Sequence, residues 1–86
     1  IQNGQTYVTT AGTQVALASS TAIYHSVTIM AQAGNSGNIY IGDSSVSSSN
    51  GYILDAGDTI EIQIANLSTI YVDSSVNGEG VSYIAT

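Results

Sequence analysis

The feature that most constrains the fold is a recurring alternation between short apolar segments and turns rich in Gly, Asn, Asp and Ser. It is clearest from Thr59 to Ala65, where Ile60, Ile62 and Ile64 are separated by polar residues. A period of two places these isoleucines on one face of a strand, so the segment is expected to be half-buried. Val, Ile and Tyr dominate the apolar positions throughout the chain, and these residue types favour strands.

Other segments also have the composition of strands. The longest runs from Ala22 to Gln32, and its alternation places His25 on the same face as apolar residues. The shorter ones are Thr6–Thr10, Gln14–Ala18, Asn38–Ile41, Tyr52–Leu54, Thr69–Asp73 and Val81–Ala85. About eight short strands in a small chain predict an all-β fold, a single antiparallel β-sandwich. A jelly-roll-like arrangement is expected, and an immunoglobulin-like one is the alternative.

Small and polar residues mark the connections between these strands. Asn50-Gly51 and Asn77-Gly78 predict short hairpin turns, because both residue types tolerate a positive φ. Gly34–Asn38 and Asp55–Asp58 are expected to form further tight connections. The length of 86 residues predicts one domain, 1–86. Within it, segment 1–20 carries little charge and is expected to be an arm or edge strand that contacts a neighbouring subunit.

Two segments of the chain are similar to each other. Ile39–Val46 and Ile70–Val76 share a strand-plus-turn pattern, and Asn-Gly follows each of them. They predict two similar units on related parts of the sandwich. Asp43 and Asp73 occupy equivalent places in these units, and calcium takes oxygen ligands of this kind. Neither segment has the spacing of a calcium-binding loop, so capping of turns is the expected role and calcium ligation the alternative.

The charge of the chain excludes several classes of function. Lys and Arg are absent, and the six charged side chains are all acidic, which gives a formal net charge of -6. Nucleic acids and anionic membrane surfaces require cations on the protein, so neither is expected as a partner. The chain also lacks Cys, which excludes disulfides and thiol chemistry. Without Lys or Arg it offers trypsin-like proteases no cleavage site, which suits an extracellular location.

Candidate catalytic residues are few. His25 is the only His, and no G-x-S-x-G motif accompanies it. Asp55 and Asp58 lie in a turn, where Asp side chains cap backbone N–H groups. A sandwich of this size scarcely forms the cleft that catalytic carboxylates use. We therefore expect no enzymatic activity, no cofactor and no resident metal.

Two weaker patterns concern sugars. Asn66-Leu67-Ser68 is the only N-x-[ST] match, so Asn66 is a candidate for glycosylation, with a plain turn as the alternative. Six Tyr residues are the only aromatics. Exposed Tyr pairs stack on sugars, but half-buried strand and interface positions are the expected roles here. A surface glycan therefore stays an alternative partner.

The segment Ala33–Ala85 contains an ordered series of motifs: G-N-S-G-N-I-Y-I-G-D, then N-G-Y, then N-L-S-T-I-Y-V-D and N-G-E-G-V-S. This series resembles a recurrent type of small all-β protein encoded with tailed-phage virion genes, although this chain departs from that type in lacking Lys and Arg. The resemblance implies a structural virion protein that decorates or reinforces a bacteriophage capsid, or belongs to its head or tail. Its implied partners are copies of itself and a capsid or other virion protein. A subunit of an extracellular pilus-like filament and a carbohydrate- or surface-binding module are the alternatives.

Overall fold

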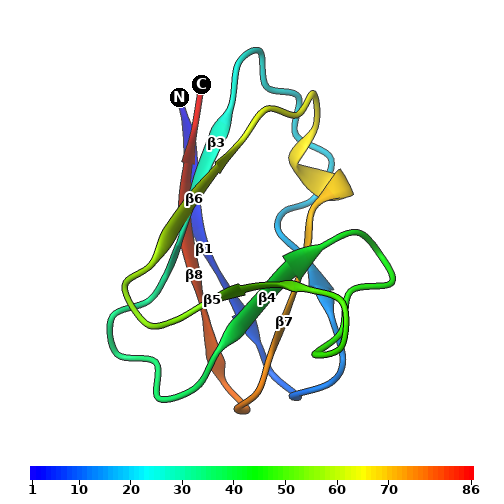
Figure 1. Ribbon diagram of the computed structural model, residues 1–86. Helices are drawn as coiled ribbons and strands as arrows, with labels where there is room; N and C mark the ends of the chain where they lie inside the picture. The colour runs from blue at the N-terminus through cyan, green and yellow to red at the C-terminus, as the bar shows by residue number, and fades with distance from the viewer.

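The alternating segments of the sequence form eight antiparallel strands in the computed structural model, which describes residues 1–86 (Figure 1). The strands are β1 (Gln2–Val8), β2 (Val15–Ala16), β3 (Val27–Ala31), β4 (Ile39–Gly42), β5 (Tyr52–Leu54), β6 (Thr59–Ile62), β7 (Tyr71–Ser74) and β8 (Glu79–Ala85). One 3-10 turn, η1 (Leu67–Thr69), precedes β7. The structure has no helix with the length and apolar character needed to cross a bilayer.

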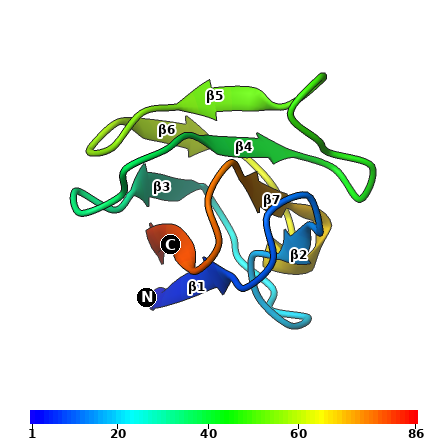
Figure 2. The same ribbon diagram turned by 90° about the horizontal axis from the view of Figure 1, so that it is seen from below.

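The strands are divided between two four-stranded sheets, with the orders β1-β8-β3-β6 and β2-β7-β4-β5. The pairing is nested, because β1 pairs with β8, β2 with β7, β3 with β6 and β4 with β5. Only β4 and β5 pair with a neighbour in the chain, so every other connection passes from one sheet to the other. Figure 2 shows β1 and β2 at one side of the molecule and β5 and β6 at the opposite side. The predicted antiparallel β-sandwich is confirmed.

The core lies between the two sheets and is built by the period-two alternation. In β3, Val27, Ile29 and Ala31 are buried, and in β4, Ile39 and Ile41 are buried. These residues belong to a cluster of 14 buried apolar side chains. The isoleucines predicted to share one face of the Thr59–Ala65 segment pack against this cluster, but they are only half-buried because β6 is an edge strand.

Two predicted strands are displaced in the structure. Of the segment Ala22–Gln32, only Val27–Ala31 forms a strand, and His25 is exposed rather than placed with the apolar face. The chain bends before Val27, where the backbone N–H groups of Tyr24 and His25 both donate to the Thr86 carbonyl at 3.1 Å. The first strand spans Gln2–Val8 instead of Thr6–Thr10, because its whole length pairs with β8.

Asn50-Gly51 lies, as predicted, between two antiparallel neighbours, β4 and β5, but their connection spans residues 43–51 and is not a short turn; the Asn77-Gly78 hairpin prediction is wrong. Asn77-Gly78 joins β7 to β8, which lie in different sheets, and neither Asn50 nor Asn77 has a positive φ. Both side chains instead accept hydrogen bonds from backbone N–H groups. The Asn77 Oδ1 accepts from Ala11 at 2.7 Å, and the Asn50 Oδ1 accepts from Ser47 at 2.8 Å. The two asparagines therefore hold loops by capping rather than by forming tight hairpins.

The two similar units of the sequence lie side by side. Their strands are β4 and β7, which pair antiparallel within one sheet, with Tyr40 opposite Asp73 and Ile41 opposite Val72. The expectation of related positions in the sandwich is therefore confirmed. The units differ after their strands, because the connection that follows β4 folds back so that the buried Val46 covers Gly42.

Candidate functional site

Strand β1 forms one edge of its sheet, and its outer side has no backbone partner. It pairs with β8 alone, and no backbone hydrogen bond outside the sheet ladders involves residues 2–7. In an antiparallel ladder, successive residues direct their N–H and C=O groups to opposite sides of the strand. On β8, the Gly80 carbonyl accepts from the Gln32 N–H at 3.1 Å, so the backbone N–H and C=O groups of Gly80 point toward β3.

The register then identifies which groups of β1 are free. The backbone groups of Gly80 point toward β3, so those of the next residue, Val81, point toward β1. There the partner of Val81 is Thr6. Thr6 and the residues of the same parity therefore bond to β8. The N–H and C=O groups of Asn3, Gln5 and Tyr7 are consequently directed to the free edge.

The other three sheet edges are blunted in ways that proteins commonly use against edge pairing. Strands β2 and β5 are short, with 2 and 3 residues. Strand β6 carries the exposed charge of Glu61. Strand β1 has 7 residues, no charged residue and no Pro, and its register with β8 is unbroken. It is the one long, neutral edge in the molecule.

Two exposed apolar side chains lie on the face of the sheet that adjoins this edge. Asn3, Gln5 and Tyr7 share the outer face of the sheet with Ile84, Ser82 and Gly80, their respective partners on β8. Tyr7 is 48% exposed and Ile84 is 51% exposed. The Tyr7 hydroxyl donates to the Gln5 Oε1 at 2.9 Å, which holds the Tyr7 side chain beside the strand.

A shallow depression of about 290 Å³ lies on the same side of the sheet. Its lining residues come from β3, β6 and β8: Thr28, Met30, Thr59, Ser82, Tyr83 and Ile84. Aliphatic side chains and hydroxyl groups thus make up the lining, with no Asp, Glu or His among them. This composition suits contact with a neutral, partly apolar surface.

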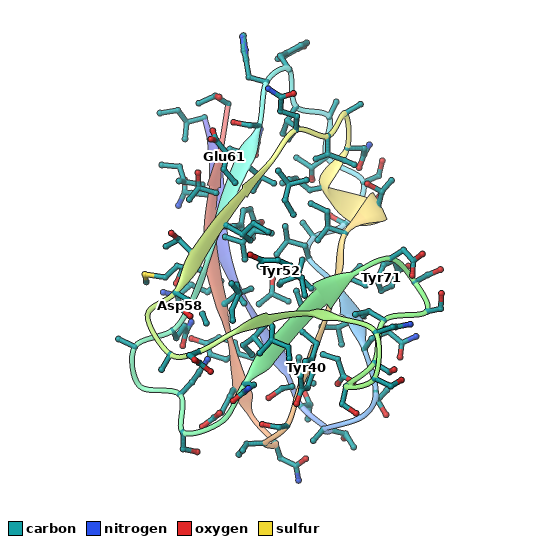
Figure 3. All side chains as sticks on the ribbon, viewed as in Figure 1. Tyr40, Tyr52, Asp58, Glu61 and Tyr71 are labelled. Atoms are coloured by element: carbon teal, nitrogen blue, oxygen red, sulfur yellow. The ribbon has the colours of Figure 1, made fainter.

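The tyrosines considered for sugar stacking are distributed over several parts of the molecule. Tyr40 and Tyr71 lie on neighbouring strands, β4 and β7, whereas Tyr52 lies on β5 opposite the buried Ile41 (Figure 3). Tyr24 is in the connection before β3 and is 91% exposed. Tyr40 and Tyr71 share one face of their sheet, because Gly42, two residues after Tyr40, is the partner of Tyr71, but Tyr40 is buried.

The candidate catalytic residues do not converge. His25 is exposed in the bend before β3. Asp58 caps its turn as expected, because its Oδ2 accepts from the Asp55 N–H at 3.1 Å. Glu61 follows on β6, where its Oε2 accepts from the Ser26 hydroxyl at 2.8 Å. Figure 3 shows Asp58 and Glu61 along β6 and the turn before it, on the side away from Tyr71.

The two candidate calcium ligands do not share a site. Tyr40 is opposite Asp73, and Asp43 follows three residues after Tyr40, just past the end of β4, about 10 Å away along the strand direction. Asp43 is exposed and accepts at 2.9 Å from both the N–H and the hydroxyl of Ser45, and these two bonds lower the pKa of its carboxyl group. No group of three or more His, Cys, Asp or Glu residues is placed to hold a metal ion.

Asp73 is only 1% exposed. Its Oδ1 accepts from the N–H groups of Gly12 at 3.0 Å and Ser74 at 2.8 Å. These bonds tie the β1–β2 connection to β7, so Asp73 caps backbone groups as the sequence predicted. Burial of a carboxylate is favourable only where hydrogen bonds replace its hydration, and the two N–H groups supply them.

The glycosylation candidate Asn66 is the N-cap of η1. Its Oδ1 accepts from the N–H and hydroxyl groups of Ser68 and from the Thr21 N–H. Its Nδ2, the atom that would carry a glycan, donates to the Ser20 hydroxyl at 3.3 Å. Asn66 therefore joins η1 to the segment that leads into β3.

Sequence reasoning missed Glu79, the carboxylate with the most hydrogen bonds. Its Oε2 accepts from the N–H of Ser36 at 2.6 Å and from the Ser36 hydroxyl at 2.8 Å, and its Oε1 accepts from the Gly37 N–H at 2.9 Å. These donors, with the backbone N–H groups contributing most, lower the pKa of Glu79. The signal in the sequence was the Gly34–Asn38 loop, whose closely spaced N–H groups require an acceptor from elsewhere.

Comparison with known proteins identified no matching family, curated protein or solved structure. The function is therefore inferred from the chain's own geometry. In that geometry, the free edge of β1 combines unpaired backbone groups with the exposed side chains of Tyr7 and Ile84 beside it.

Proposed function

We propose that this chain is a non-enzymatic structural subunit of a virion, which works by associating with copies of itself and docking on the particle shell. One observation carries this function: the long, neutral β1 edge lies beside an outer face that exposes Tyr7 and Ile84. Open sheet edges add strands from other chains, and aromatic residues are enriched in protein interfaces.

We infer further that the sandwich is a jelly roll. Its nested order places β8 between β1 and β3. An immunoglobulin-like order would instead place the first strand beside the second in one sheet. Jelly rolls occur in viral capsid proteins and in lectins, so the strand order supports a virion role by analogy of fold.

The size of the core supports a role in an assembly. The buried cluster contains 14 residues, and the chain has no disulfide to add to its stability. Small domains of this kind bury a modest fraction of their surface and have a thin margin of stability. Association with other subunits stabilises the folded state by mass action. A surface rich in Ser, Thr and Asn also packs against neighbours while burying few charges.

Purification of the native particles that carry this chain tests the function. We expect the chain to remain with icosahedral or tailed particles through density-gradient centrifugation, as seen by negative-stain electron microscopy. Its presence should be verified by mass spectrometry after cleavage at Asp and Glu, because the chain offers trypsin no site. Recovery in regular filaments would support the pilus-like alternative. A monomer that binds only a glycan array would overturn the structural role.

A further inference from the structure

We propose that two copies of this chain pair antiparallel along β1, with a twofold axis at Gln5, so that two four-stranded sheets become one continuous sheet. This inference rests on the proposed function, since it specifies how copies associate. The evidence is the register of the free edge, the side chains beside it and the position of the charges.

The register of the edge is self-complementary. The outward N–H and C=O groups belong to Asn3, Gln5 and Tyr7. Antiparallel pairing centred on Gln5 places Gln5 opposite its own copy, and Asn3 opposite Tyr7 of the second copy. All three residues then occupy hydrogen-bonded positions, so every outward N–H group of both copies finds a carbonyl acceptor. A shift of the register by two residues would leave some of these groups unpaired.

The side chains of the same residues fit this arrangement. They share the outer face of the sheet, so the two Gln5 amides meet at the axis, where each offers both a donor and an acceptor. Tyr7 would lie against Asn3 of the second copy, and that Asn3 is adjacent to Ile84 on β8. Tyr7 of one copy and Ile84 of the other would then lie on the same face of the joined sheet, with Asn3 between them.

The distribution of charge favours a second copy as the partner. Each copy has a net charge of -6 and no Lys or Arg, so two copies repel except where carboxylates are distant. The exposed Asp55, Asp58 and Glu61 lie in and beside β6, at the opposite edge of the sheet from β1. A basic partner would be attracted to that opposite edge. The β1 edge itself carries no charged side chain, and Glu79, opposite Val8 on β8, is bonded to the Ser36 and Gly37 N–H groups, so identical chains approach this edge with little repulsion.

Concentration-dependent hydrogen exchange, followed by NMR on the whole chain, tests the register directly. In the monomer, the amides of Asn3, Gln5 and Tyr7 are open to solvent, whereas those of Gly4 and Thr6 are bonded to β8. We expect the first three amides to gain protection as the concentration rises, while Gly4 and Thr6 are protected throughout. Sedimentation velocity on the same samples should show a monomer–dimer equilibrium.

Charge substitution at the axis provides a second test. Gln5→Lys places two like charges opposite each other, so we expect the dimer Kd to rise about tenfold or more. Gln63→Lys is the matched control, because Gln63 is exposed just after β6 and the net charge changes equally. Gln5→Glu should also weaken the dimer, and a mixture of the Gln5→Lys and Gln5→Glu variants should restore association. Only a register that places residue 5 opposite itself predicts this rescue.

The outcomes separate this inference from the proposed function. Alternating protection in β1 together with rescue by the mixed variants supports both. A dimer whose protected amides lie elsewhere, or whose Kd is unchanged by Gln5→Lys, overturns the β1 pairing and leaves self-association standing. A chain that is monomeric at millimolar concentration but remains bound to particles also overturns the pairing, and it leaves shell docking intact. A monomer absent from particles contradicts both.

Discussion

Gly80 is the position at which a single methyl group should most directly disturb the β1 edge. A Cβ added at Gly80 would lie 2.9 Å from both the Thr6 carbonyl carbon and the Tyr7 Cα, and closer still to the Thr6 carbonyl oxygen. Nonbonded carbon atoms normally approach to about 3.5–4.0 Å. All of these atoms belong to the backbone of β1, so no rotation of a side chain relieves the clash, and β1 itself must move away from β8.

The cost follows from this geometry. Overpacking substitutions typically destabilise proteins by about 1–3 kcal/mol. We expect Gly80→Ala to reach the upper end, about 3 kcal/mol, because the backbone of a seven-residue strand must shift. For a small domain with a urea m-value of about 1 kcal/mol/M, this lowers the unfolding midpoint by about 3 M.

Gly34→Ala is the matched control, since a Cβ at Gly34 has no atom within 4 Å and its φ is ordinary. It should be neutral or stabilise the chain by about 0.4–1 kcal/mol through the entropy of the unfolded state. Urea unfolding followed by circular dichroism compares the two variants. Free energies of unfolding that agree to within about 0.5 kcal/mol would refute the claim that a methyl group at Gly80 clashes with the backbone of β1.

Other substitutions test separate parts of the structure. Glu79→Gln should lower the urea midpoint at neutral pH. Because bonding lowers the folded-state pKa of Glu79, its stabilisation is present above the ordinary value of 4.5 and is lost as the pH falls through the lowered pKa, so the two midpoints should converge in acid. Ile29→Ala, at a fully buried position, should cost about 2–5 kcal/mol in urea unfolding, whereas Ile53→Ala, on an exposed side chain, should cost less than about 0.5 kcal/mol. Asn66→Ala should lower the thermal midpoint by removing the cap of η1, at a cost of about 1–2 kcal/mol, and Ser68→Ala, which removes only one hydroxyl donor, should cost less.

Local chemistry was sufficient to predict most of the strands and the class of fold. Tyr52–Leu54 is a strand with the predicted bounds, and the isoleucines of Thr59–Ala65 face the core. Both results follow from alternation, since neighbouring residues of a strand point to opposite faces wherever the strand lies. Asp58 likewise caps its own turn, because its acceptor and donor are three residues apart.

Partners that are distant in the sequence could not be predicted in the same way. Asn77-Gly78 has the composition of a hairpin turn, yet it crosses between sheets because β8 pairs with β1 and β3 rather than with β7. Nothing near Asp73 in the sequence indicates that its carboxylate is buried or that the Gly12 N–H donates to it. Glu79 received no role until the fold brought it to Ser36 and Gly37.

The candidate interface shows the same division. The sequence by itself determined that the first twenty residues carry little charge and that strand pairing with a neighbour is chemically open to them. Only the tertiary structure decided that β1 occupies a sheet edge, and that Asn3, Gln5 and Tyr7 are the residues whose backbone groups are free. Alternation sets which face a side chain takes, whereas the identity of the edge depends on which strands pair, and that choice is made by packing among segments far apart in the chain.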